Sequence, residues 1–254
     1  MFLLEVRDIS MHFGGIRAIE EITLKVKEGL IMSIIGPNGA GKTTFFNCLT
    51  GLARPSKGTI RFAGRDIGRL LPHDIVRLGI ARTFQNIRLF RDMSVIENVM
   101  VAQHCRTRAG LLSAVARWRS FRDEERIIRE KAFEYIDFVG LSEYSDTVSG
   151  SLPYGAQRRL EIARALAAEP MLILLDEPTA GMNPQETLKV MELIKNIKGF
   201  GKTVLIIEHD MKVVMEISDR IAVLNHGVKI AEGQPSEIRN DQTVIEAYLG
   251  KEYS

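Results

Sequence analysis

Residues 36–44 constrain the fold of this chain more than any other segment. Their sequence, GPNGAGKTT, fits the pattern G-x-x-x-x-G-K-[ST] of a phosphate-binding loop. The apolar residues 31–35 before the loop predict a buried parallel strand, and residues 43–50 behind it, followed by Gly51, predict a helix that ends at a glycine. A strand, a glycine-rich loop and a helix in this order predict an α/β fold with an anion site at the loop.

Backbone groups and two side chains of this loop are suited to hold phosphates. Glycines let the chain turn so that successive N–H groups point at the β- and γ-phosphates, beside the positive end of the following helix. Lys42 adds a positive charge, and the hydroxyl of Thr43 is the expected ligand of Mg²⁺. The predicted nucleotide-binding residues are Gly36, Pro37, Asn38, Gly39, Ala40, Gly41, Lys42, Thr43 and Thr44.

Length, composition and charge exclude several classes of protein. The chain has 254 residues, of which 45% are hydrophobic and 26% charged, as in a globular protein with one large core. No apolar run approaches the roughly 18 residues of a membrane-spanning helix, and the first residues show no secretory signal. A net charge of +2 gives no indication of nucleic-acid binding. We therefore expect a cytoplasmic protein that needs other chains if it acts across a membrane.

Two further apolar runs end in residues that can do chemistry. Residues 171–175 precede Asp176 and Glu177, and residues 203–207 precede His209. Alternation along a strand sends neighbouring side chains in different directions, so one carboxylate can face a metal and the other an attacking water. Parallel sheets bind ligands beyond the carboxyl ends of their strands. These residues and the phosphate-binding loop are therefore predicted to share one site.

Three segments near the N-terminus alternate between apolar and polar residues. Residues 3–9, 22–26 and 58–62 have the pattern of half-exposed strands and predict a small antiparallel sheet. Phe13, beside Gly14 and Gly15, lies between the first two of these strands. Its ring either stacks on an adenine base or fills the core, and the sequence leaves both interpretations open.

The middle of the chain predicts a short strand and several helices. Residues 80–84 predict a strand that leads to Gln85, and Ser94 with Glu97 forms a capping-box pattern at the start of a helix. Residues 151–166 predict a loop that enters a helix, whose first turn can face an anion.

The segment between these two helices is strongly basic. Seven arginines lie between positions 106 and 129, and apolar residues recur at helical spacing up to Gly140. The basic face is either solvated, or it contacts anionic lipid head groups or an acidic loop of a partner.

Together, these motifs resemble those of the ATP-binding subunits of ATP-binding cassette (ABC) transporters. The ordered set consists of Phe13, residues 36–44, Gln85, the signature region 152–157, Asp176 with Glu177, and His209. Within that superfamily the chain most resembles the ATP-binding subunits of branched-chain amino acid importers. The stretches that carry this second resemblance are residues 82–86, 157–166, 207–211 and 246–250.

The resemblance implies a fold and a division into domains. It implies a P-loop NTPase (RecA-like) core with a small antiparallel β subdomain and an inserted α-helical subdomain. Residues 1–86 and 160–254 would form the ATP-binding core, and residues 87–159 the helical subdomain with the signature. It also implies a head-to-tail dimer that holds ATP between the phosphate-binding loop of one chain and the signature of the other, where Ser151 and Gly155 would act in trans.

Roles for single residues follow from the resemblance as well. The implied catalytic residues are Glu177, His209, Gln85 and Lys42, the implied ligands of Mg²⁺ are Thr43, Gln85 and Asp176, and Phe13 would stack on the base of ATP. Two positions depart from the usual pattern. The signature Leu-Ser-Gly-Gly-Gln is replaced by LPYGA at residues 152–156, and Asn183 stands where an aspartate is common.

The resemblance finally implies partners and a location. The expected partners are transmembrane permease subunits, a second and different ATP-binding subunit, and indirectly an external solute-binding protein, with no nucleic acid. The chain would lie on the inner face of the cell membrane. Two other functions remain open: the ATPase of a lipopolysaccharide-type exporter, and a non-transport ATPase that acts on DNA or ribosomes.

Overall fold

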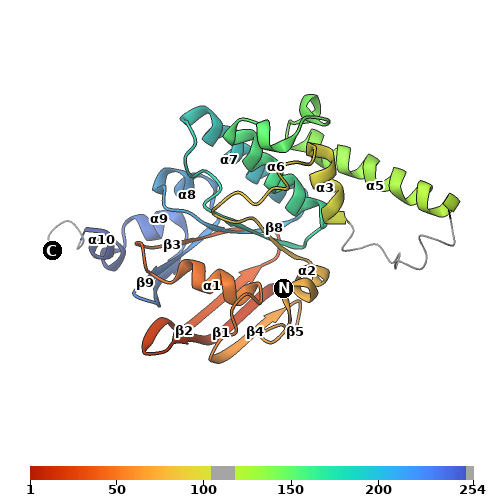
Figure 1. Cartoon of the computed structure of the whole chain (residues 1–254). Helices are drawn as coiled ribbons and strands as arrows, with labels where there is room; N and C mark the ends of the chain where they lie inside the picture. Colours follow the sequence, from red (N-terminus) through yellow and green to blue (C-terminus); the bar gives the residue numbers. More distant parts are fainter. Residues whose placement is uncertain (104–117, 250–254) are drawn as a thin grey trace. The chain divides into compact units, whose positions relative to one another are not determined.

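The computed structural model describes residues 1–103 and 118–249, with only the backbone described for 118–124 and 249. The chain forms two compact units (Figure 1). The first unit comprises residues 1–82 and 171–254, and the second comprises residues 83–170.

The first unit contains an antiparallel sheet of four strands in the order β2-β1-β4-β5. Its strands are β1 (Phe2–Phe13), β2 (Ile16–Lys27), β4 (Lys57–Phe62) and β5 (Arg65–Asp66). The pairing of β1 with both β2 and β4 confirms the small antiparallel sheet predicted from the alternating pattern. One face of this sheet is buried, as the alternation requires.

The first unit also contains a sheet of six strands in the order β10-β9-β3-β8-β7-β6. Its strands are β3 (Ile31–Ile35), β6 (Ile80–Arg82), β7 (Leu172–Asp176), β8 (Thr203–Ile207), β9 (Arg220–Asn225) and β10 (Val228–Gly233). All neighbours pair in parallel except β10, which is antiparallel to β9. Every residue of β3, β7 and β8 is buried, which explains why these strands are continuous apolar runs in the sequence.

Most helices of the first unit follow strands of the six-stranded sheet or lie near the C-terminus, whereas α2 lies between β5 and β6. They are α1 (Lys42–Leu49), α2 (Pro72–Leu78), α7 (Pro184–Gly199), α8 (Met211–Ile217), α9 (Pro235–Arg239) and α10 (Gln242–Leu249). At the start of α7, Asn183 Oδ1 accepts hydrogen bonds from the backbone N–H groups of Gln185 and Glu186, both at 3.0 Å. The asparagine that departs from the usual pattern therefore serves as a helix cap.

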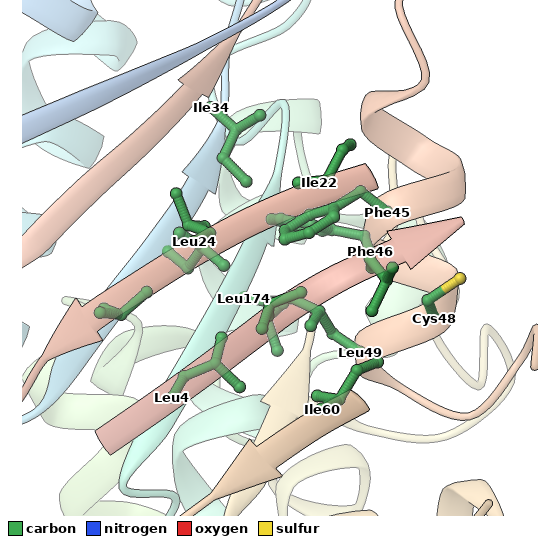
Figure 2. Packing of buried hydrophobic residues seen from close by; sticks show 14 of the residues in the cluster. Leu4, Ile22, Leu24, Ile34, Phe45, Phe46, Cys48, Leu49, Ile60 and Leu174 are labelled. Carbon is green, nitrogen blue, oxygen red and sulfur yellow. The ribbon is translucent and has the colours of Figure 1, made fainter. Parts of the chain in front are cut away.

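One hydrophobic cluster joins the two sheets of the first unit through α1. Figure 2 shows Phe45, Phe46 and Leu49 of this helix in one cluster with Ile22 and Leu24 of β2. The same cluster includes residues of β3, β7 and β8, and both phenylalanines are fully buried. Since α1 is held on both sides, the phosphate-binding loop that precedes it has a rigid support.

The described part of the second unit, residues 83–103 and 118–170, is helical. It contains α3 (Val95–Gln103), α5 (Trp118–Phe138) and α6 (Tyr154–Ala167), with 3₁₀ turns at Ser142–Tyr144 and Ser149–Ser151. The capping box is confirmed, because Ser94 N donates to Glu97 Oε2 at 2.8 Å and Glu97 N donates to Ser94 Oγ at 3.3 Å. In α5, Ala132 and Ile136 are fully buried, as their helical spacing predicts.

Three features differ from the sequence-based expectations or lie beyond the structure. Strand β6 ends at Arg82 rather than residue 84, because Arg82 is the last residue to pair with β7. The predicted boundary at residues 159 and 160 would divide α6, whereas this helix packs on α3 and α5 and belongs as a whole to the second unit. The part of the predicted basic segment in residues 104–117 lies outside the described residues.

Among the helices in residues 1–103 and 118–249, none combines the length and apolar character of a membrane-spanning segment.

Candidate nucleotide-binding site

The phosphate-binding loop has backbone conformations and close contacts that require glycine. Gly36 has φ +149°, and a Cβ placed there would lie 2.0 Å from the carbonyl oxygen of Leu224. Gly41 has φ +95°, and its Cβ would lie 2.6 Å from the carbonyl oxygen of Ala18. Any other residue at these two positions would displace backbone, so the loop pattern in the sequence reflects the space available.

Lys42 is held inside the loop. Its Nζ donates to the carbonyl oxygens of Gly36 at 2.6 Å and Pro37 at 3.0 Å, and the residue is only 8% exposed. The neighbouring Thr43 is exposed at the first turn of α1. This turn contains no acidic residue, and its N-cap Gly41 has no side chain to satisfy the helix N–H groups. The loop therefore presents a cation, a hydroxyl and the positive end of a helix together.

Glu177 and His209 lie next to each other, because they follow the neighbouring strands β7 and β8. Glu177 Oε2 is 3.7 Å from His209 Nδ1, and their side chains are 18% and 59% exposed. Glu177 has φ +48°, which is rare for a residue with a side chain, and its N–H donates to the carbonyl oxygen of Ile207 at 2.9 Å. Strained conformations of this kind are retained at functional positions. Both residues are accessible to a ligand.

Asp176, the last residue of β7, is held by a residue to which the sequence analysis assigned no role. Arg82 Nη2 donates to Asp176 Oδ2 at 2.7 Å, and the two side chains are 5% and 4% exposed. The sequence contained one indication of this ion pair, an arginine in the otherwise apolar run 80–82, because a buried charge needs a partner.

Glu208 is a second residue that the sequence analysis left without a role. It is fully buried, and its Oε1 accepts hydrogen bonds from Thr179 N at 3.0 Å and Thr179 Oγ1 at 2.6 Å. Its Oε2 accepts from His209 N at 3.1 Å. Glu208 thus holds the turn after Glu177 and the residue that carries the histidine. The sequence signal was a carboxylate at the end of a buried strand.

Phe13 lies at the end of β1 and is 52% exposed, which contradicts the alternative that it fills the core. Its ring is accessible for stacking on a planar group.

Gln85, Ser151 and Gly155 belong to the second unit and are described within it. The guanidinium of Arg158 donates to the backbone carbonyl oxygens of Phe84 and Gln85. Ser151 Oγ is exposed and donates to the carbonyl oxygen of Val148 at 2.7 Å, so it turns back onto its own 3₁₀ turn. Gly155 is buried in the first turn of α6. The structure thus places Glu177 beside His209, places Asp176 at the end of β7, and holds Gln85 by its backbone.

The oxygen donors of the first unit suit Mg²⁺. A threonine hydroxyl at the start of α1 and a carboxylate at the end of β7 are hard ligands of the kind that Mg²⁺ prefers. No group of three or more His, Cys, Asp or Glu side chains in the described residues could hold a metal by itself. A site with one carboxylate leaves the remaining positions to water and substrate phosphates, which is the usual arrangement for this ion.

Comparison with known proteins identifies the family. The family model described as ABC transporter matches residues 19–180, and the model described as branched-chain amino acid ATP-binding cassette transporter matches residues 228–254. The chain therefore belongs to the ABC transporter family, and it is an ATPase of that family.

Individual relatives match the chain over nearly its whole length. It is 48% identical over 250 residues to the high-affinity branched-chain amino acid transport ATP-binding protein BraF of Pseudomonas aeruginosa, covering 98% of each chain. It is 47% identical, with the same coverage, to LivG of Escherichia coli, which carries the same description. The probable LivG of Archaeoglobus fulgidus is 37% identical and matches 100% of this chain and 98% of its own.

Solved structures match the fold. The ADP conformation of an ATP-binding cassette of an ABC transporter superposes with a TM-score of 0.86 at 33% identity, covering 98% of this chain and 99% of the other. A nucleotide-free ATP-binding cassette superposes with the same TM-score, identity and coverage. These similarities confirm the predicted P-loop NTPase fold.

Proposed function

We propose that this chain is the ATP-hydrolysing subunit of an importer for branched-chain amino acids, acting on the inner face of the membrane with partner permease subunits. The observation that carries the proposal is the convergence of Lys42, Asp176, Glu177 and His209 beyond the ends of neighbouring parallel strands, with 3.7 Å between Glu177 Oε2 and His209 Nδ1. The descriptions of BraF and LivG support the solute.

Binding of ATP uses groups on both ends of the nucleotide. Phe13 stacks on the base, while Lys42 and the N–H groups at the start of α1 bind the β- and γ-phosphates. In the structure Lys42 already donates to Gly36 and Pro37, so the loop has its curved shape before any phosphate enters. Preorganisation of this kind reduces the entropy lost on binding. Bound Mg²⁺ would supply charge neutralisation, with Thr43 and Asp176 as its protein ligands in the first unit.

Hydrolysis depends on the orientation of a water molecule. Glu177 accepts a hydrogen bond from this water, whose oxygen forms a bond to the γ-phosphorus as the bond to the bridging oxygen breaks. His209 steadies the γ-phosphate and, 3.7 Å from Glu177, limits the motion of that carboxylate. Glu208 supports both residues through Thr179 and the backbone of His209. Catalysis is mainly positioning and charge neutralisation.

A second chain completes the site in this proposal. The signature region of one subunit faces the ATP bound to the other, with Ser151 and Gly155 as the contacting residues. Pro153 lacks the hydroxyl of the usual serine and also lacks a backbone N–H. A heterodimer with two unequal sites is therefore favoured over a homodimer.

The test is uptake in cells that lack this chain. Deletion of its gene should abolish uptake of radiolabelled leucine at low external concentration, and the wild-type chain should restore it while Lys42→Ala should not. Uptake of lysine in the same cells controls for energy and membrane integrity. Normal leucine uptake after deletion would contradict an importer for branched-chain amino acids and favour the exporter or the non-transport alternative.

A further inference from the structure

A buried ion pair connects two neighbouring strands at the candidate site. Arg82 is the last residue of β6 and Asp176 the last residue of β7, and these strands pair in parallel. The distance from Arg82 Nη2 to Asp176 Oδ2 is 2.7 Å, and both side chains are almost inaccessible to solvent. Asp176 is the carboxylate that suits Mg²⁺, so this arginine is in direct contact with the candidate metal ligand.

The same guanidinium also contacts the helix that follows the phosphate-binding loop. Arg82 Nη1 donates to Asn47 Oδ1 at 2.8 Å, and the Arg82 guanidinium lies 5.4 Å from the centroid of the Phe46 ring. Asn47 and Phe46 both belong to α1. One planar group therefore joins α1, β6 and β7, and its separated N–H donors make this possible in a way that a lysine ammonium cannot copy.

Stability alone does not account for such a pair. Burying two charges costs several kcal/mol per ion, and apolar replacements of buried pairs are often neutral or stabilising. The ion pair occupies Oδ2, while a carboxylate has a second oxygen with its own lone pairs. Orienting one oxygen with a fixed donor leaves the other in a defined position. This matters for Mg²⁺, which demands near-ideal octahedral geometry.

We propose that Arg82 is a positioning residue for the Mg²⁺ site. It fixes the carboxylate of Asp176 relative to α1, and therefore relative to the hydroxyl of Thr43 at the start of that helix. Arg82 is also the last residue of the first unit before the chain enters the second unit and reaches Gln85. The proposal rests on the function proposed above, since it assumes that Mg²⁺ accompanies the nucleotide.

The experiment measures metal dependence separately from turnover. A fluorescent, non-hydrolysable ATP analogue is titrated onto the full-length chain in EDTA and then at increasing Mg²⁺, and Mn²⁺ binding to the complex is followed by electron paramagnetic resonance. For Arg82→Gln we expect the Mg²⁺ concentration at half-maximal effect to rise about 10- to 100-fold, as for other partners of metal ligands. Affinity for the analogue in EDTA should stay within about threefold of wild type.

Three further variants make the result specific. Arg82→Lys keeps the charge but not the second contact, so its Mg²⁺ requirement should lie between wild type and Arg82→Gln. Asn47→Ala keeps the ion pair but removes the closer of the two oxygens to which Arg82 Nη1 donates, Asn47 Oδ1 at 2.8 Å and Thr50 Oγ1 at 3.4 Å, and it should raise the requirement about threefold or more. Arg77→Gln, on the exposed side of α2, is the matched control and should behave as wild type. Asn47→Ala decides the question if Arg82→Gln does not fold.

An unchanged Mg²⁺ requirement in folded Arg82→Gln or Asn47→Ala would overturn the inference, because Arg82 would then have a structural role alone. A lower requirement would also overturn it, because the Arg82 guanidinium would then compete with Mg²⁺ for the carboxylate of Asp176. If the wild-type chain itself binds the analogue equally in EDTA and in Mg²⁺, this inference fails, whereas the proposed function is tested separately by the uptake of leucine.

Discussion

Each of the two units buries one arginine beside a functional segment, but the two arginines hold different parts of the chain. In the first unit Arg82 contacts the side chain of Asp176, a residue suited to the reaction. In the second unit Arg158 contacts backbone carbonyl oxygens at Phe84 and Gln85, and its charge is balanced by Glu161 at 3.0 Å. The first arrangement fixes a reactive group, whereas the second fixes the course of a loop.

This difference predicts different consequences of mutation. In the first unit, single side chains are proposed to act directly on phosphate, water or metal, so substitutions should alter chemistry more than stability. In the second unit the contacts support backbone, so substitutions should alter stability or the partner's site more than this chain's own chemistry.

Glu177→Gln should lower ATP turnover by about 10²- to 10⁴-fold while ATP binding persists. The amide keeps the shape of the side chain but loses the charge that orients water. Steady-state phosphate release and binding of a fluorescent ATP analogue measure the two properties separately. Glu216→Gln, an exposed carboxylate on α8, is the control. Turnover like that of wild type would remove Glu177 from the catalytic role.

Lys42→Ala should weaken nucleotide binding about 10- to 100-fold, which is the range for a lost hydrogen bond to a charged group. The alanine also loses the two hydrogen bonds to Gly36 and Pro37, so the nucleotide-free variant should melt at a lower temperature. Equilibrium titration and thermal denaturation check these outcomes, with the exposed Lys195→Ala as control. Affinity within about threefold of wild type would contradict the proposed site.

Pro153→Ser should have a moderate effect that depends on the partner subunit. Pro153 is the N-cap of α6 and makes no side-chain cap, so a serine there should stabilise this helix by about 1 kcal/mol. If the signature faces the partner's ATP, the added hydroxyl should also raise turnover at that site by up to about tenfold.

Turnover in complexes assembled from wild-type and variant subunits separates the two sites. Pro72→Ser, at the first turn of α2, changes the same residue type without approaching the site. Two kinetically identical sites, before and after substitution, would rule out the unequal heterodimer.

Glu161→Gln should show the smallest effect, a change in how stability depends on pH. Burial raises the pKa of the Glu161 carboxyl above 4.5, against the lowering effect of hydrogen bonds from Arg88 and Arg158. Between 4.5 and the raised value, the folded chain holds a proton that the unfolded chain has released. Wild-type stability therefore falls, relative to the variant, as the pH rises through this window.

Urea denaturation of both proteins across this range gives the difference in unfolding free energy. The prediction is tested by the sign with which this difference in unfolding free energy changes as the pH rises. A difference that is constant with pH, or that changes in the opposite direction, would show that Glu161 does not titrate as its burial requires.

Local patterns in the sequence were sufficient to predict the principal elements and most of the site in the first unit. The loop glycines at 36 and 41 are needed because of positive φ angles and close carbonyl groups, and the capping box at Ser94 is a contact between residues three apart. The strands before Asp176 and His209 are continuous apolar runs because both of their faces are covered. Each of these features leaves a pattern in a short stretch of the sequence, even where the close carbonyl groups, those of Leu224 and Ala18, belong to distant residues.

The contacts that orient these residues were decided by the tertiary structure. Arg82 meets Asp176 across 94 positions because β6 lies beside β7 in the sheet, and Glu208 meets Thr179 because β8 lies on the other side of β7. Strand order is a property of the whole packed core and leaves no mark on any short stretch of sequence. The sequence thus determined which groups can react, and the order of the strands decided which buried charges hold them in place.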